Sequence, residues 1–345
     1  MSGTLDATGS NARFSRLDGV AISVDGSFAL LGSTDADHRI RKLTLSTLEV
    51  TTLSGSATEF GNVNGIGTNA RFNGPRYFVI SHTGVSAYIT DSGNHGIRVM
   101  IISTTSVSLL AGGTSTIGNF SDGVGSSAKF NSPYSSTISP DDSLLFVCDS
   151  GNHIIRKIIT SSREVTTIAG TSGVSGSTDG RGTNAKFTSP YAITISYFDG
   201  SYLLVGGYSD NVVRKVTLST FDVITIAGQG STFGFVNSFG TNALFGGIQC
   251  LHLSRDETYV LVCDENNNMI RRISLSNMAV TTVAGLAKSH VDGVGTNAAF
   301  QEPLSLSLSP TGNYALVGDR MSNVVRKLDL FGKSSLSMKY LVDFL

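Results

Sequence analysis

One sequence pattern recurs six times along this chain of 345 residues, and it restricts the possible fold more than any other feature. Each copy has an alanine two residues before a phenylalanine, then apolar runs, and then a segment resembling Ile-Arg-Lys. The same phenylalanine recurs every 55 to 58 residues, at Phe14, Phe72, Phe130, Phe187, Phe245 and Phe300. The same arginine recurs at Arg41, Arg98, Arg156, Arg214, Arg271 and Arg326. A fixed period of this length, built from short apolar runs and Gly-rich turns, is typical of a propeller or a solenoid.

The third copy shows how one unit is expected to fold. Residues 134–139 alternate between small polar and larger side chains, and residues 144–148 form a continuous apolar run. Two further short runs follow, at 154–159 and 164–168. Four consecutive antiparallel strands make one propeller blade. We therefore predict an all-β, six-bladed β-propeller with four strands per blade and almost no helix. The prediction is a single domain over residues 1–345, with blades at about 10–55, 66–112, 124–170, 181–228, 239–285 and 294–340.

A charged pair recurs between the second and third strands of a unit. If Asn152-His153 form a two-residue hairpin, Asp149 and Arg156 lie directly opposite each other on one face of the sheet. The same pair recurs as Asp91 with Arg98, Asp264 with Arg271, and Asp319 with Arg326. Units one and four have Thr34 and Gly207 where the acid is expected. We interpret the pair as structural.

The loop between units also repeats, and it begins with a side-chain oxygen. The first position is Asp6, Asn64, Asp122, Asp179, Asn237 or Asp292. One carboxylate per loop is far short of a calcium ligand set, so turn capping is the favoured interpretation, with calcium as the alternative. We expect no other cofactor. The fourth position is always glycine, which predicts a positive φ at Gly9, Gly67, Gly125, Gly182, Gly240 and Gly295.

Composition argues against some classes of partner. The chain has 25 basic and 26 acidic residues, so no excess charge favours nucleic acid. No apolar stretch is long enough for a membrane span, and the N-terminus lacks a signal-peptide pattern, which leaves the compartment open. We expect a monomer that is not inserted in a membrane.

The three cysteines do not form a disulfide framework. Cys148 and Cys263 occupy the same repeat position two units apart. Cys250 and Cys263 fall on neighbouring strands of one unit, but in the expected register they are not opposite each other. We predict three buried free thiols.

The last unit keeps its third strand at residues 324–330, and its fourth strand is expected at about 334–340, where the repeat has decayed. Blade six is therefore predicted to take all its strands from the C-terminal end. Ring closure then depends on packing between blades six and one.

The pattern of apolar strand, Asp, Asn, Ile-Arg-Lys and Val-Thr-Thr-Ile-Ala-Gly is complete in residues 149–170. It resembles the NHL-repeat proteins, and the resemblance extends from Asn11 to about Leu330. It implies a six-bladed propeller. The family includes protein-binding platforms, single-stranded RNA-binding modules, extracellular sensor domains and a metal-dependent peptide-amidating lyase, and lactonase-type propellers are more remotely similar. Fold alone does not choose among these functions.

The innermost strands line the channel of a propeller, so their residues are candidates for chemistry. Of the two alternating sets of positions, the set with smaller side chains is the better candidate for the wall, and we expect it to offer His252 as its only ionisable group. A catalytic metal needs about three protein ligands, so a lone histidine argues against an enzyme. We assign no catalytic and no metal-binding residue. A metal-assisted hydrolase or lyase with His252 in the channel is the alternative, and single-stranded RNA binding is a second alternative.

The residue four positions after the recurring phenylalanine varies strongly among the units, and in units two, three, four and six it follows a proline that we call the anchor proline. It is Asp18, Arg76, Tyr134, Tyr191, Gln249 or Leu304. Tyr and Arg dominate binding hot spots, so Arg76, Tyr134, Tyr191 and Gln249 are the candidate partner-binding residues, with His252 in the channel. Histidines at the turns between second and third strands, His38, His95 and His153, are explained by turn preference. We predict a non-enzymatic scaffold that binds a protein or peptide through the face carrying the inter-blade loops.

Overall fold

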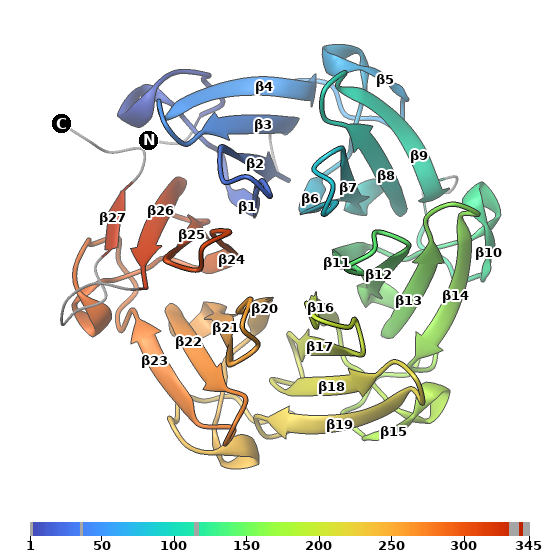
Figure 1. Ribbon diagram of the computed structural model, residues 1–345, viewed down its shortest axis with the longest axis vertical. Helices are drawn as coiled ribbons and strands as arrows, with labels where there is room; N and C mark the ends of the chain where they lie inside the picture. The colour runs from blue at the N-terminus through green and yellow to red at the C-terminus, as the bar shows by residue number, and fades with distance from the viewer. Residues whose placement is uncertain (1–2, 35–36, 114–116, 331–337, 341–345) are drawn as a thin grey trace.

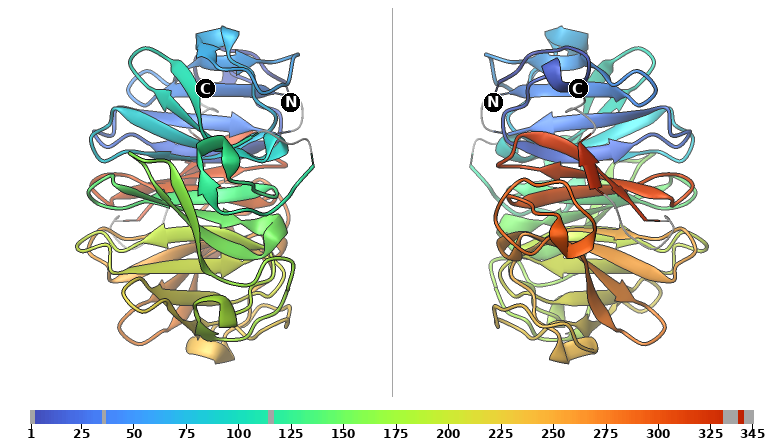
Figure 2. Two further views of the ribbon diagram at one scale, coloured as in Figure 1. Left: turned by 90° about the vertical axis from the view of Figure 1, so that its right-hand side faces the viewer. Right: turned by 90° about the vertical axis from the view of Figure 1, so that its left-hand side faces the viewer.

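The computed structural model describes residues 3–34, 37–113, 117–330 and 338–340. Six antiparallel sheets stand around a central axis, which confirms the predicted six-bladed β-propeller (Figure 1). In each blade the first strand lies beside the axis and the last lies at the rim. Seen from the side, the ring is a thick disc with loops on both faces (Figure 2).

The strands follow one another in sequence order within each blade. Blade one contains β1 (Leu17–Ile22), β2 (Phe28–Ser33), β3 (His38–Thr44) and β4 (Glu49–Ser56). Blade two contains β6 (Pro75–Ile80), β7 (Ser86–Asp91), β8 (Gly96–Ile101) and β9 (Ser106–Gly112). Blade three contains β11 (Pro133–Ile138), β12 (Leu144–Asp149), β13 (Ile154–Ile159) and β14 (Glu164–Ala169). Blade four contains β16 (Pro190–Ile195), β17 (Tyr202–Gly207), β18 (Val213–Thr217) and β19 (Asp222–Ala227). Blade five contains β20 (Ile248–Leu253), β21 (Tyr259–Asp264), β22 (Met269–Ser274) and β23 (Val280–Ala284). Blade six contains β24 (Pro303–Leu308), β25 (Tyr314–Asp319), β26 (Val324–Asp329) and β27 (Met338–Tyr340).

Loops between blades protect the outer edges of three sheets. The two-residue strands β5 (Gly65–Ile66), β10 (Gly123–Val124) and β15 (Gly180–Arg181) pair with the outermost strands of blades two, three and four. All helix in the described residues is in single 3-10 turns of three residues, and none has the length or hydropathy of a membrane span.

The order of strands defines two faces. Loops that join the last strand of one blade to the first strand of the next lie on what we call the inter-blade face. Turns between second and third strands lie on the same face, because antiparallel strands alternate in direction. The turns between first and second strands lie on the opposite face, called the hairpin face.

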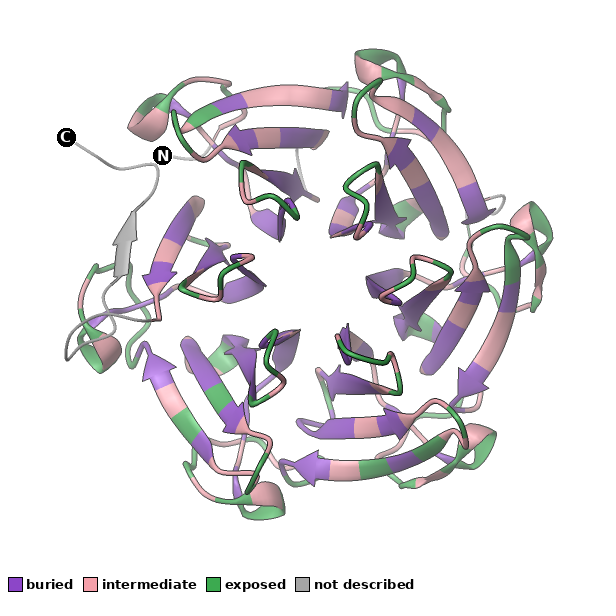
Figure 3. Ribbon diagram, in the orientation of Figure 1, coloured by how far each residue is buried: buried purple, intermediate pink, exposed green. Residues whose placement is uncertain are grey.

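The anchor phenylalanines fill the spaces between adjacent blades. All six have at most 2 % of their surface exposed. Phe72, for example, packs against Leu30 and Ile40 of blade one and Ile89 of blade two. Buried residues gather on the inner strands, whereas exposed ones lie on the loops and outer strands (Figure 3). The repeat period therefore reports the interface between blades rather than a surface feature.

The recurring arginine is a buried structural hub, as predicted. Arg156 donates to Asp149 Oδ2 at 2.9 Å, and it also donates to the carbonyl oxygens of Lys129 (2.9 Å) and Ser121 (2.8 Å) of the preceding loop. The predicted register is wrong, however. Asp149 pairs with Ile154 and Arg156 with Val147, because a four-residue turn replaces the two-residue hairpin. The ion pair forms diagonally across the two strands, within the reach of an arginine side chain.

Units one and four also have a buried acid, which the sequence comparison missed. Asp210 pairs with Arg214 at 3.1 Å, and Asp37 pairs with Arg39 at 2.5 Å. Each lies three residues after the expected position, where units two, three and five have an asparagine that hydrogen-bonds the acid, as Asn152 does with Asp149. In all six units the turn between the second and third strands thus has a buried carboxylate that pairs with an arginine of the third strand.

The repeated inter-blade loops require a positive φ at one glycine, and their first residue has a capping role. All six glycines at the fourth position have positive φ, between +52° and +58°, as predicted. Asp122 accepts from Arg156 at 2.9 Å and from the Thr167 hydroxyl at 3.0 Å. The first residue of the loop thus ties the loop to the third and fourth strands of its blade.

All three cysteines are buried free thiols, as predicted. The predicted register of one pair is wrong, because Cys250 and Cys263 are directly opposite across β20 and β21. This pairing continues the regular ladder from Leu253 and Val260, so the turn between β20 and β21 sets it, and the irregularity between Ile248 and Cys250 lies beyond it. The sequence pattern alone does not fix the length of that turn.

Ring closure between blades six and one uses specific polar contacts. Blade six takes its four strands in order from the C-terminal end, as predicted, although residues 334–337 of the expected fourth strand lie outside the described residues. Asn323 Oδ1 accepts from the Arg16 backbone N–H at 2.7 Å, and Ser307 Oγ accepts from that of Ile22 at 3.0 Å.

Truncation after Leu330 is expected to promote aggregation. It removes β27, whose residues Met338 and Tyr340 pair with Leu328 and Arg326 of β26. The backbone of β26 is then exposed as an edge. Light scattering and size-exclusion chromatography should show oligomers and a lower melting temperature. A truncated chain that stays monomeric with unchanged melting would contradict this role of β27.

Candidate functional site

The variable residues after the anchor proline come together at the inter-blade end of the channel. The Arg76 guanidinium lies 4.6 Å from the centre of the Tyr134 ring. The Tyr134 and Tyr191 rings are stacked, 3.9 Å apart and 10° from parallel. Each residue starts the innermost strand of its own blade, so three successive blades supply neighbouring members of one stack.

A third ring, Tyr208, extends the stack and was not among the predicted residues. It lies 4.9 Å from Tyr191 at an interplanar angle of 15°. Tyr208 directly follows β17, and the matching position in other units varies as strongly, being Ser92, Ser150, Glu265 or Arg320. Comparison of the units at this second variable position would have identified it.

Polar contacts between blades close the centre of this region. Tyr134 donates its hydroxyl proton to Gln249 Oε1 at 2.5 Å, and Gln249 Nε2 donates to Glu265 Oε2 at 2.7 Å. Arg320 and Asp18 form an ion pair at 3.1 Å. All four predicted mouth residues therefore belong to one contact network.

The members of this network differ in solvent exposure and therefore in whether they can contact a partner. Tyr134 and Gln249 are 5 % and 4 % exposed, so they support their neighbours rather than meet a partner directly. Arg76, Tyr191 and Tyr208 are partly exposed. Although burial acts in the opposite direction, Tyr134 and Asp18 raise the pKa of Arg76, so this residue stays a cation at the mouth. Burial raises the pKa of Tyr134, which keeps its hydroxyl protonated as a donor.

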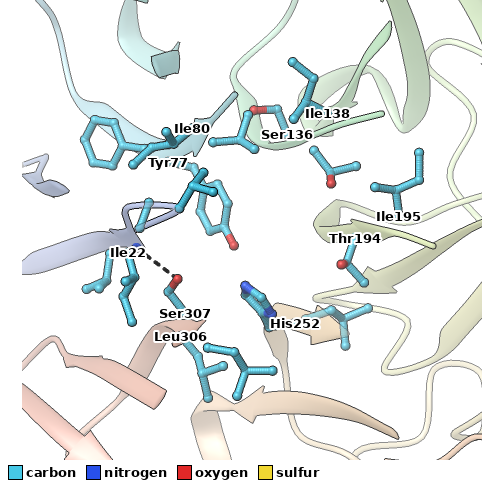
Figure 4. A pocket seen from close by; sticks show the side chains of 18 of the residues that line it. Ile22, Tyr77, Ile80, Ser136, Ile138, Thr194, Ile195, His252, Leu306 and Ser307 are labelled. Carbon is cyan, nitrogen blue, oxygen red and sulfur yellow. Dashed lines mark hydrogen bonds between the residues drawn. The ribbon is translucent and has the colours of Figure 1, made fainter. Parts of the chain in front are cut away.

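His252 lies in the channel and not with the mouth residues. It lines a cavity of about 120 Å³ that reaches the hairpin face (Figure 4). Burial lowers the pKa of His252 to about 4, so the imidazole is neutral near pH 7. Its Nδ1 is 3.1 Å from the Leu253 carbonyl oxygen, which can only accept, so the proton is on Nδ1 and Nε2 is an acceptor.

The cavity wall differs from the prediction in two respects. Both alternating sets of inner-strand positions line it, since Thr194 and Ser307 occur together with isoleucines such as Ile22 and Ile80. His252 is also not its only ionisable group, because His82 and Arg255 from the hairpin face contribute. Within the described residues, no three His, Cys, Asp or Glu side chains come together in a way that could hold a metal ion.

The turn residues between second and third strands have an inter-blade role that the sequence did not reveal. His95 and His153 have positive φ, as turn preference predicts. Each also accepts a hydrogen bond at Nδ1 from a backbone N–H of the next blade, His95 from Ser132 at 2.9 Å and His153 from Ser189 at 3.1 Å. The six acceptors in ring order are His38, His95, His153, Asn211, Asn268 and Asn323.

These features define a six-bladed β-propeller whose repeats resemble the NHL type. Among curated proteins, the chain is similar to human NHL repeat-containing protein 2, with 26 % identity over 270 residues, which is 70 % of this chain and 36 % of that protein. The resemblance noted in the sequence is thus confirmed. The chain spans little more than a third of the length of this relative. No family model matches the chain.

Solved structures support the fold. A protein of unknown function from Bacteroides thetaiotaomicron has a TM-score of 0.71 at 18 % identity, over 98 % of this chain and 73 % of that one. An auxiliary nutrient binding protein from the same organism has a TM-score of 0.69 at 14 % identity, over 98 % of this chain and 72 % of the other. At these identities the likeness shows the fold alone.

Proposed function

We propose that this propeller is a binding module that engages a protein or peptide through its inter-blade face. The observation that supports the proposal is an aromatic band, which we define as Arg76, Tyr134, Tyr191, Tyr208 and Phe233. It runs from the channel mouth to the exposed loop between blades four and five.

Two adjacent glycines allow the band to continue across blade five. A Cβ atom on Gly247 would lie 2.9 Å from the Tyr208 ring, and one on Gly246 would lie 2.7 Å from the Phe233 ring. The Tyr208 ring therefore packs on the backbone of Gly247, and the Phe233 ring packs on the backbone of Gly246. Unit five is the one unit with glycine at both positions between the recurring phenylalanine and the innermost strand.

The loop at the outer end of the band exposes several large apolar side chains. Phe233 is 63 % exposed and Phe239 is 60 % exposed, and Phe235 and Val236 between them are each 42 % exposed. Four large apolar side chains within seven residues are more than the scattered exposure of an ordinary surface. Exposed apolar groups next to stacked tyrosines and an arginine match the composition of protein-binding hot spots. The expected partner is a protein segment with apolar side chains and an acceptor for Arg76.

The test is selection from a displayed peptide library against the immobilised protein, followed by titration of the selected peptides. The variant Phe233→Ser/Phe239→Ser is expected to weaken binding at least about tenfold, because each truncated aromatic anchor typically costs 2 kcal/mol or more. Arg76→Ala should weaken the same peptides. The matched control is Phe198→Ser, since Phe198 is 75 % exposed but lies on the hairpin-face turn between β16 and β17.

The outcomes separate the two faces. Loss of binding in the loop and Arg76 variants, with the Phe198 variant unchanged, supports the inter-blade face. Loss in the Phe198 variant alone would place the interaction on the hairpin face and refute the proposed site. Selected peptides that bind all variants equally would remove the aromatic band from the function.

A further inference from the structure

Cys250 and Cys263 form a pair that the binding function does not use. They are register partners on adjacent antiparallel strands, and both are free and buried. Directly opposite Cα atoms in antiparallel pairs are about 4.5–5.5 Å apart, which is within the roughly 4.4–6.8 Å that a disulfide spans. Cys250 Sγ also donates to the Leu306 carbonyl oxygen at 3.5 Å.

The pair is adjacent to the channel through a single side chain. Tyr77 lines the cavity, and its hydroxyl oxygen is 3.4 Å from Cys250 Sγ. Figure 4 shows the Tyr77 hydroxyl pointing into the cavity, opposite His252. The cavity of about 120 Å³ holds a few water-sized molecules, since each water occupies roughly 30 Å³. A small neutral oxidant in the cavity therefore meets the Tyr77 hydroxyl, which is the group that separates the cavity from Cys250.

We propose that Cys250 and Cys263 are a peroxide-reactive thiol pair that closes to a cross-strand disulfide within folded blade five. Cys250 is the attacking residue, because it alone contacts both Tyr77 and Cys263. Cys263 is the resolving residue, on the side away from the channel.

The electrostatics of the pair support this order. The neighbouring Cys263 thiol, against the effect of burial and together with the Tyr77 hydroxyl, lowers the pKa of Cys250. Burial, followed by the neighbouring Cys250 thiol, raises the pKa of Cys263. The thiolate is the nucleophile in reactions with peroxide, so the residue with the lower pKa reacts first.

The reaction balances with hydrogen peroxide as the oxidant. The Cys250 thiolate attacks one peroxide oxygen, an S–O bond forms, the O–O bond breaks, and hydroxide leaves and takes up the thiol proton as water. Cys263 Sγ then attacks Cys250 Sγ of the sulfenic acid, an S–S bond forms, the S–O bond breaks, and a second water leaves. Two thiols are oxidised to one disulfide and one peroxide is reduced to two waters.

The third cysteine is a matched control within the same chain. Cys148 occupies the position of Cys263 in blade three, but its hydrogen-bond neighbour is Ser135, where blade five has Cys250. Burial raises the pKa of Cys148 to about 12. Cys148 thus has the same strand environment without a partner sulfur.

The test treats the reduced, folded protein with hydrogen peroxide, alkylates the remaining thiols after denaturation, and maps peptides by mass spectrometry. The expected result is a Cys250–Cys263 linkage with Cys148 alkylated, and Cys148 reacting at least roughly tenfold more slowly. Tyr77→Phe should slow the linkage several-fold, because it removes a donor to the thiolate, and should leave Cys148 unaffected. The proposal is overturned if Cys148 is oxidised in parallel, if Cys250 proceeds to sulfinic acid unlinked, or if linkage appears only under denaturing conditions. The wild-type mapping decides the matter even if a variant fails to fold.

Discussion

Arg156→Met is expected to destabilise the protein by about 3–5 kcal/mol, the usual cost of removing one partner from a buried ion pair. Asp149 and Arg156 have no exposed side-chain surface. The variant leaves Asp149 and the carbonyl oxygens of Lys129 and Ser121 without the guanidinium that they now bind. The packing of the arginine on the Phe130 ring, 4.7 Å from its centre, is lost as well. Urea denaturation measures the effect.

The pH dependence distinguishes loss of the ion pair from loss of packing. Burial already raises the pKa of Asp149 to about 6, in spite of Arg156. Without the arginine this pKa rises further, so the folded variant binds a proton that the unfolded chain releases above its ordinary value near 3.8. Stability of the variant should therefore fall as pH rises through 6, and the deficit should be larger at pH 8 than at pH 5.

The control for this experiment is Lys157→Met on the same strand. Lys157 is only partly buried, and its replacement should change stability by less than about 0.5 kcal/mol. A change in peptide binding by Arg156→Met with stability intact would show that the arginine is functional rather than structural.

Acid is expected to loosen half of the ring, and replacing three histidines with asparagine should abolish that effect. His38, His95 and His153 each accept a backbone N–H of the next blade at Nδ1. A protonated imidazole has a proton on both nitrogens and cannot accept, so protonation removes the bond. Asn211, Asn268 and Asn323 make the equivalent bonds in the other half and do not titrate.

The direction of the pH effect follows from these hydrogen bonds and from the pKa of His153. Burial lowers the pKa of His153 below 6.5, so the unfolded chain binds the proton first as the pH falls. The contribution of these bonds to stability is complete well above pH 6.5 and decreases as the pH falls below that value. The loss is bounded at about 2 kcal/mol per histidine by pH 5, since one pKa unit corresponds to about 1.4 kcal/mol.

The measurement compares urea denaturation of the wild type and His38→Asn/His95→Asn/His153→Asn between pH 8 and pH 5. Carboxylates such as Asp149 titrate in both proteins, so the difference isolates the histidines. The variant is expected to match the wild type at pH 8 and to be more stable at pH 5. Equal slopes in the two proteins would show that these inter-blade bonds do not respond to pH.

The repeat alone was enough to predict the propeller. Its period, the short apolar runs and the invariant phenylalanines and glycines are local and recur six times, so each unit independently repeats the same pattern. The buried arginine and its acid were predictable for the same reason. The glycine requirement at Gly67 and its equivalents followed from chemistry, because a positive φ disfavours residues with a Cβ atom.

The site was predictable only in part. Arg76, Tyr134, Tyr191 and Gln249 were identified as a variable set, and they do share one network. Tyr208 was missed because it lies 17 residues further along the chain than Tyr191 and meets it only across the blade. His252 was correctly expected in the channel, but that its cavity reaches the hairpin face was not evident.

The amino-acid sequence thus determined the blade, its hydrophobic anchors and the number of units, because these depend on alternation and spacing within about 57 residues. Tertiary structure decided that Cys250 lies opposite Cys263, how far the acid lies from Arg156 along its turn, and which face the aromatic band covers. Those features depend on turn length, on diagonal side-chain reach and on contacts between separate blades. Such contacts arise only when the ring closes, so a pattern that repeats within one unit carries no information about them.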